Sequence, residues 1–250
     1  MDYNFGSPNW NLSLGREAEW VLGGPRAYGY QYGDVFDRAQ LQYNNGKLAV
    51  TAGYGKFKEG LGVGFYGDNN IDGAKTAYGE IEGFFGNGSA AGVYYNNFNG
   101  DNEGEPGYFN GDDLWGAYAS VNFGSKWNVL ANYEHVNLVS NTNITNDDSA
   151  DVWIGRVTYG KTSMATPKSW DIWVEYIDAE DGAFLGGSTN SWRFSNYMDN
   201  ITSWGAGVDY VFAKNAMFSV MQSFATDTKD GDTNNAAEKE QTRAQFVFAF

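Results

Sequence analysis

The chain has 250 residues, no cysteine, a formal charge of −15 and an aromatic content of 17 Phe, 17 Tyr and 9 Trp. This aromatic content excludes a disordered acidic chain, because disordered segments lack the apolar surface that would offset the entropy lost on folding. The acidity excludes a nucleic-acid partner, since phosphate contacts need a basic face. Without cysteine, disulfide scaffolds and thiolate zinc sites are also excluded.

Hydropathy alone describes a soluble protein: the mean hydropathy is −0.49, and no apolar run approaches the roughly 20 residues of a membrane-spanning helix. Apolar and polar residues nevertheless alternate with period 2 along most of the chain, which predicts half-buried strands, and no stretch shows a convincing helical stripe. We predict strands at residues 9–16, 35–43, 47–57, 76–85, 89–96, 114–123, 126–136, 151–160, 168–177, 201–212, 215–224 and 241–250.

Short and long connections alternate between these strands. Each strand that leads into a short turn ends in an aromatic residue, so the repeating unit is one hairpin with its long loop. The long connections are 17–34, 58–75, 97–113, 137–150, 178–200 and 225–240. The repeated aromatic residues are Phe5, Tyr43, Phe85, Phe123, Tyr159, Phe212 and Phe250.

An aromatic girdle near one rim of short turns, with long loops at the opposite rim, is typical of a transmembrane β-barrel. A β-sandwich or a propeller predicts neither rim. Only alternate residues of such a barrel face lipid, which explains the low mean hydropathy. The sequence therefore predicts an all-β fold, a transmembrane antiparallel β-barrel in the outer membrane, with short periplasmic turns and long extracellular loops.

Counting in steps of two from each girdle residue assigns the apolar set to lipid and a polar set to the lumen. Glycines 53, 55, 116, 205 and 207 fall in the lumen set, where we expect them to leave room for a pore. The charged residues predicted to line this pore are Arg16, Arg38, Glu80, Glu82, Glu134, Arg156, Asp171, Glu175 and Arg243.

Two segments and the girdle repeat carry a family resemblance. Residues 3–16 match a descending strand, a turn and an ascending strand that ends in Gly-Arg, and residues 244–250 end in Phe250. Over essentially its whole length the chain resembles bacterial outer-membrane general porins. Its overall character is similar to the S-layer-homology-anchored major porins (OmpM type) of diderm Firmicutes. The resemblance implies a 16-stranded barrel, a homotrimer, and recognition of Phe250 by the barrel assembly machinery.

We expect residues 1–250 to form a single barrel domain with 12 full strands and the end of a 13th. Met1, Tyr3 and Phe5 keep the lipid-facing phase of a strand that starts upstream, which predicts a mature or truncated chain. Such a chain lacks its N-terminal strands, its signal peptide and any S-layer-homology domain. A 16-stranded barrel is the leading expectation, with 14 or 12 strands as alternatives.

With 16 strands, the loop at 17–34 becomes the third extracellular loop, which in porins folds inward. Glu17, Glu19 and Arg26 would then join the pore constriction, with an ordinary surface loop as the alternative. The long loops also hold most of the acidic residues, and an acidic mouth concentrates cations and repels anions.

The predicted function is a water-filled channel for passive diffusion of ions and small hydrophilic solutes, mildly selective for cations. One alternative is an envelope tether or adhesin built on a barrel. Another is a saccharide-selective channel, which needs Trp153, Trp173 and Trp192 as stacking platforms, although Trp153 falls in the lipid-facing set. Outer-membrane lipids and further copies of the chain are the expected partners.

Enzymatic chemistry finds no support in the sequence. His135 is the only histidine, and it falls in the lipid-facing set at the end of its strand, so a rim histidine is expected rather than the catalytic base that a barrel phospholipase or protease needs. The acidic stretch at 227–232 fails the EF-hand register, because Asn235 and Gln241 occupy the glycine and glutamate positions. We expect no cofactor, with weak divalent-cation binding by the acidic loops as the alternative.

Overall fold

The computed structural model describes residues 1–22, 33–58, 73–99, 111–139, 148–185, 191–193, 198–229 and 240–249. Its strands are β1 (Asp2–Asn4), β2 (Trp10–Val21), β3 (Gly33–Asn44), β4 (Leu48–Lys58), β5 (Lys75–Phe84), β6 (Ala90–Asn99), β7 (Gly111–Phe123), β8 (Trp127–Leu138), β9 (Ser149–Gly160), β10 (Trp170–Ala179), β11 (Ile201–Ala213), β12 (Ala216–Thr228) and β13 (Thr242–Phe248). No helix formed by the described residues is long and apolar enough to cross a membrane.

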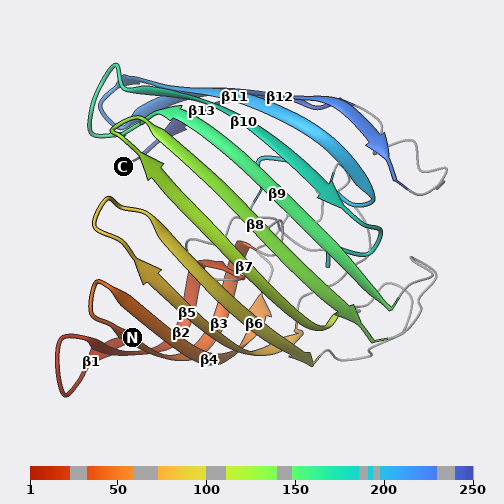
Figure 1. Cartoon of the computed structure of the whole chain (residues 1–250). Helices are drawn as coiled ribbons and strands as arrows, with labels where there is room; N and C mark the ends of the chain where they lie inside the picture. Colours follow the sequence, from red (N-terminus) through yellow and green to blue (C-terminus); the bar gives the residue numbers. More distant parts are fainter. Residues whose placement is uncertain are drawn as a thin grey trace.

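Every strand pairs antiparallel with the next one along the chain, so that a single 13-stranded sheet follows the sequence order. The sheet bends strongly, and its short turns and both chain ends lie at the left of Figure 1. Among the described residues β1 and β13 do not pair with each other, so each forms an edge of the sheet.

The strands confirm the predicted ranges to within a few residues, and the largest departure is β2. The predicted end of this strand is residue 16, whereas the strand continues to Val21 through a register shift between Glu17 and Trp20. Gly15 has a φ of 105°, which L side chains rarely adopt. Alternation of apolar and polar residues does not predict the end of β2, because the pairing is irregular there and residues 16, 17 and 19 are charged.

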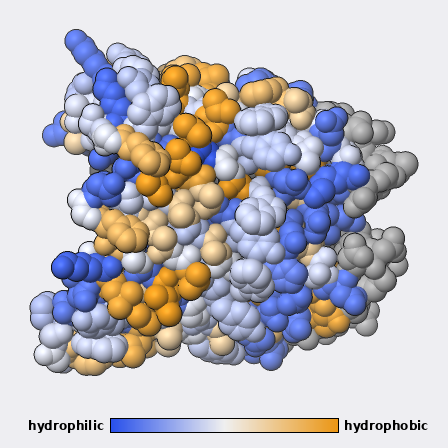
Figure 2. Space-filling view, viewed as in Figure 1, coloured by the Kyte–Doolittle hydropathy of each residue, from blue (hydrophilic) through white to orange (hydrophobic). Residues whose placement is uncertain are grey.

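The outer face of the sheet carries an apolar band of exposed side chains. Ile81, Val93 and Val208 expose 51%, 53% and 47% of their surface, values that a soluble sheet would not leave uncovered. In Figure 2 the apolar residues gather on the half of the visible face nearer the short turns. This distribution is that of a sheet whose outer side contacts lipid.

The aromatic girdle lies on this outer face near the short turns. Tyr43 packs against Trp10 with ring centres 5.1 Å apart, and Tyr159 packs against Trp127 at 4.7 Å. Phe250 lies outside the described residues. The exposed members of the girdle are Phe5, Phe85, Phe123 and Phe212.

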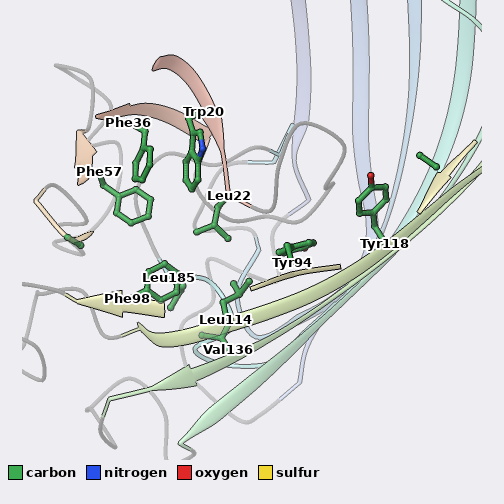
Figure 3. Packing of buried hydrophobic residues seen from close by; sticks show 12 residues of the cluster. Trp20, Leu22, Phe36, Phe57, Tyr94, Phe98, Leu114, Tyr118, Val136 and Leu185 are labelled. Carbon is green, nitrogen blue, oxygen red and sulfur yellow. The ribbon is translucent and has the colours of Figure 1, made fainter. Parts of the chain in front are cut away.

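Buried apolar residues lie on the inner face, where they form two clusters. One gathers side chains of β2–β8 (Figure 3): Trp20, Leu22, Phe36, Phe57, Tyr94, Phe98, Leu114, Tyr118 and Val136, together with Leu185. The other lies on β9–β11 and includes Ala183 and Met198 of the β10–β11 connection. The core of the molecule is therefore inside the curved sheet, as in a barrel whose interior is partly filled.

Candidate pore lining

Two walls of different chemistry make up the described inner face. The carboxylate–tyrosine wall consists of Glu80, Glu82, Tyr94, Tyr118 and Glu134 on β5–β8. The three carboxylates, each predicted to face the interior, are 8%, 3% and 0% exposed. They lie on the inner face, and their role in a constriction stays a prediction.

A repeated three-residue arrangement builds this wall. Tyr94 of β6 lies across Gly116 of β7, its register partner, and donates a hydrogen bond of 2.7 Å to Glu134 of β8. A ring can lie flat over the neighbouring strand only where that strand has no Cβ beneath it. The glycine therefore sets the direction of the tyrosine.

The same arrangement occurs twice more. Tyr118 crosses Gly92 to donate to Glu82, and a Cβ on Gly92 would lie 2.6 Å from the Tyr118 ring. Tyr78 crosses Gly53 and donates a bond of 2.9 Å to Gln40. Inward Tyr, Gly and an acceptor on three successive strands are thus a recurring unit of this sheet.

The prediction that the inward glycines leave room for a pore is wrong. Each is covered by an aromatic ring, which occupies the volume that a side chain would have taken. Glycines 53, 55, 116, 205 and 207 lie under Tyr78, Phe36, Tyr94, Trp192 and Trp173 respectively.

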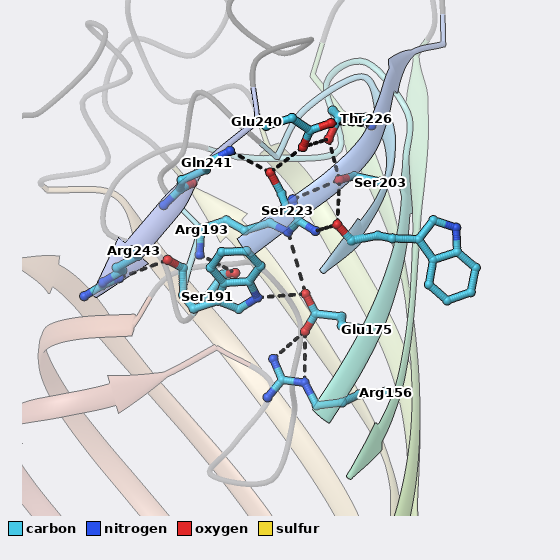
Figure 4. A network of polar contacts seen from close by, with 12 residues as sticks. Arg156, Glu175, Ser191, Arg193, Ser203, Ser223, Thr226, Glu240, Gln241 and Arg243 are labelled. Carbon is cyan, nitrogen blue, oxygen red and sulfur yellow. Dashed lines mark hydrogen bonds and ion pairs between the residues drawn. The ribbon is translucent and has the colours of Figure 1, made fainter. Parts of the chain in front are cut away.

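The arginine wall lies on the other side of the interior and consists of Arg156, Glu175, Arg193 and Arg243 (Figure 4). Glu175 of β10 is 3% exposed and pairs with Arg156 of β9. Its Oε1 accepts a bond of 3.0 Å from Trp192 Nε1 and lies 3.6 Å from Arg193 Nε.

The β10–β11 connection is the inward segment that sequence reasoning missed. Arg193 is 1% exposed and donates to Ser203 Oγ at 3.1 Å and to the carbonyl of Trp204 at 3.0 Å. Arg243 of β13 donates to the carbonyl of Trp192 at 3.0 Å. These bonds hold the connection against β10, β11 and β13.

Leu185 belongs to the same connection and packs in the opposite cluster, where Figure 3 places it beside Phe98, Leu114 and Val136. The connection therefore contacts both sides of the interior. A signal was present in the sequence, because Trp192 and Leu185 are large apolar side chains for a solvated loop, but nothing in the alternation pattern selected them.

Asp199 fastens the base of this connection. Its carboxylate accepts hydrogen bonds from the backbone N–H groups of Gly182 at 3.3 Å and Phe184 at 3.2 Å. Burial raises the pKa of Asp199 to about 7, and the negative charge of Asp181 adds to the shift.

Trp173 offers no stacking platform for a sugar. Its ring is 6% exposed, with the Arg156 guanidinium 4.4 Å from its centre and the Trp192 ring centre 5.6 Å away. Trp153 is 55% exposed on the outer face, as its phase predicts. The three tryptophans therefore do not line a common track.

The prediction that Arg16 faces the interior is wrong. Arg16 pairs in register with Asp37 on the outer face, where its Nε lies 2.8 Å from Asp37 Oδ1. Arg16 continues the outward series of Trp10, Leu12 and Leu14, and the charge is tolerated there because it lies at the long-loop end and has a carboxylate partner.

Arg38 lies on the inner face and pairs with Glu17 at 2.9 Å. Asp171 also lies inside, where it accepts a bond of 2.9 Å from the Thr162 backbone. Of the predicted constriction loop at 17–34, Trp20 and Leu22 turn into the interior cluster. The Glu19 side chain and all of Arg26 lie outside the described residues.

His135 lies on the outer face, as predicted. Its Nδ1 is 2.6 Å from Asp151 Oδ1, and the Trp115 ring packs beside it at 5.9 Å. It contacts neither wall of the interior.

No protein-family model and no curated protein matches this chain. Solved structures of proteins from Pseudomonas aeruginosa match the fold of this chain at low sequence identity. OccK2 (OpdF), crystallised in complex with glucuronate, is 12% identical, with a TM-score of 0.53 over 86% of this chain and 60% of that chain. OccK7 (OpdD) is 12% identical, with a TM-score of 0.53 over 86% of this chain and 59% of that chain. OccK9 (OpdG) is 15% identical, with a TM-score of 0.50 over 88% of this chain and 59% of that chain.

The chain therefore spans about three-fifths of the length of these structures. They are bacterial outer-membrane porins, which are channels. Together with the antiparallel sheet in sequence order and the apolar outer band, the likeness shows that this chain has the porin β-barrel fold.

Proposed function

We propose that this chain forms a water-filled outer-membrane channel through which ions and small hydrophilic solutes diffuse passively, with a mild preference for cations. The supporting observation is that carboxylates outnumber guanidinium groups among the described inner side chains. A net negative wall raises the local concentration of cations. The carboxylates are Glu17, Glu80, Glu82, Glu134, Asp171, Glu175, Asp209 and Glu240, and the guanidinium groups are those of Arg38, Arg156, Arg193 and Arg243.

The zero-current potential of the reconstituted chain in a planar bilayer under a KCl gradient tests this function. We expect a steady conductance and a potential of the sign that cation permeation gives. Absence of conductance contradicts the channel, and a potential of the opposite sign contradicts the cation preference.

A saccharide-selective channel is a second candidate, and the arginine wall favours an acidic sugar over a neutral one. OccK2 is described in complex with glucuronate, but the shared fold alone does not transfer that ligand. Conductance measured with added glucuronate and with added glucose separates the two channels. Block by glucuronate alone favours the selective channel.

Several structural features accompany the proposal. Unpaired strand edges are not tolerated in hydrocarbon, so we propose that further strands close the barrel between β1 and β13, giving 16 in total. We also propose a homotrimer, extracellular long loops, assembly through Phe250, and an N-terminal S-layer-homology tether. Native mass spectrometry of the extracted protein and sequencing upstream of residue 1 test the oligomer and the tether.

A further inference from the structure

A row of charged side chains crosses the outer face of β2–β5 at the long-loop end. Arg16, Asp37, Lys56 and Lys75 are successive register partners on four neighbouring strands, so their side chains lie side by side on one face. Lys58 follows Lys56 by two residues and shares its side of β4. We call Arg16, Lys56, Lys58 and Lys75 the basic rim.

Within this row, Lys56 and Lys75 form a directly opposed pair of like charges. Such pairs destabilise a sheet unless an anion lies between them. Asp37 is the nearest carboxylate in the row, but both of its oxygens bind Arg16, at 2.8 and 2.9 Å. Among the described residues no carboxylate forms an ion pair with Lys56 or Lys75.

The surface next to this pair is apolar. Toward the short turns the outward residues of β4 and β5 are Tyr54, Ala52, Ala77 and Gly79, and Tyr54 is 54% exposed. A free inorganic anion would need only the two lysines. An amphiphile would also use the apolar strip, because its hydrocarbon can lie against small side chains.

The outer face of β7–β10 has the opposite charge at the same end. Asp113, Asp151 and Asp178 face outward there, and Lys229 is bound to Asp178 at 2.5 Å. These carboxylates repel an anionic headgroup unless a cation lies between them. The two sides of the molecule therefore differ in what they can bind directly.

We propose that Lys56 and Lys75, flanked by Arg16 and Lys58, bind the phosphate of a membrane lipid whose acyl chains lie over Ala52, Ala77 and Gly79. The proposal rests on the outer-membrane location proposed above. It assigns to the outer wall a lipid site that is independent of conduction. The phosphate relieves the repulsion between the two ammonium groups.

Native mass spectrometry of the full chain released from micelles tests this site, with diphosphoryl lipid A and phosphatidylcholine as probes and with EDTA present throughout. We expect retention of lipid A and not of phosphatidylcholine, weakened about thirty-fold by the double substitution Lys56→Gln and Lys75→Gln, since each lysine near an anionic surface contributes about 1 kcal/mol. The matched control is Lys47→Gln with Lys214→Gln at the short-turn end, which we expect to retain lipid A.

Equal retention by the double variant and the control overturns the site. Failure of the wild type to retain lipid A in the presence of EDTA also overturns it. Competition by millimolar inorganic phosphate shows a free-anion site and also overturns the lipid assignment. Conductance is measured on the same samples. A double variant that still conducts but no longer retains lipid A shows that the lipid site and the channel are independent. Loss of conductance in the wild type contradicts the channel and not the lipid site.

A second variant keeps the test independent of folding defects. Lys75→Glu converts the like-charge pair into an opposite-charge pair, so we expect a higher thermal midpoint in neutral detergent and a smaller increase when lipid A is added. A wild-type protein that gains no stability from lipid A overturns the proposal.

Discussion

The two walls of the interior are both polar, yet they are held together in different ways. The carboxylate–tyrosine wall is built within the sheet, because each tyrosine reaches its acceptor by crossing a glycine on the strand between them. The arginine wall depends on the β10–β11 connection, which brings Trp192 and Arg193 onto Glu175. One wall is fixed by register and the other by a loop.

This difference separates what each wall can do. Groups fixed by register keep their positions as long as the strands pair, so Glu82 and Glu134 stay hydrogen-bonded to Tyr118 and Tyr94. Groups fixed by a loop depend on a smaller set of contacts, which a single substitution or a proton can remove. Substitutions in the two walls should therefore change different properties of the proposed channel.

The largest effect is expected from Arg193→Ala in the arginine wall. Arg193 is 1% exposed, and its loss leaves the buried Glu175 with one cation fewer, which typically costs about 3–5 kcal/mol. We expect a lower thermal midpoint and a larger single-channel conductance, because the connection loses its hold on β10 and β11.

Arg16→Ala is the matched control for this substitution. It removes the same side chain from an exposed outer position, and we expect neither the conductance nor the midpoint in lipid-free neutral detergent to change appreciably. If both arginine variants behave alike, the connection does not narrow the interior.

A smaller loss of stability is expected in the carboxylate–tyrosine wall from Gly92→Ala. The new Cβ would lie 2.6 Å from the Tyr118 ring and 3.1 Å from the Ile81 carbonyl, and overpacking of this kind costs about 1–3 kcal/mol. Thermal unfolding measures the effect. Gly155→Ala is the control, since its Cβ meets nothing within 4 Å and the cost should stay within about 0.5 kcal/mol.

The carboxylate–tyrosine wall was largely predictable from the sequence, whereas the arginine wall was not. Period-2 alternation assigns Glu80, Glu82 and Glu134 to the inner face, because each side chain of a strand has only two directions to choose from. Alternation continued from Trp10, Leu12 and Leu14 places Arg16 outside, so the prediction of an inner Arg16 has the wrong phase. What the glycines do depends on which strand lies beside them, which alternation does not encode.

Loop contacts escape sequence reasoning for a different reason. Trp192 and Leu185 have no strand phase, so nothing local states whether they point into the interior or into solvent. The predicted inward loop at 17–34 contributes Trp20 and Leu22 to the interior. The 178–200 connection, predicted only as a long loop, supplies Arg193 and Leu185.

A change in selectivity without a large loss of stability is expected from Glu82→Gln. The amide keeps an acceptor for Tyr118 but removes a negative charge from the inner face, so the zero-current potential should move toward zero. Asp37→Asn makes the same chemical change on the outer face and should leave the potential unchanged. Equal shifts in the two variants would show that the potential reports the total charge and not the wall.

The last expected effect depends on pH, and it concerns the loop-held wall alone. The pKa of Asp199 is raised from 3.8 to about 7, so the folded chain keeps this proton at pH values where the unfolded chain has lost it. The contribution of Asp199 to the free energy of unfolding is therefore greatest below about pH 4. It falls as the pH rises toward 7 and no longer changes above pH 7. We expect the thermal midpoint to decrease across this window, and Asp199→Asn to remove this part of the slope because the amide does not titrate. Asp227→Asn, at an exposed position, is the control and should keep the slope. A wild-type slope that survives in Asp199→Asn would assign the titration to another group and leave the connection without a proton-sensitive anchor.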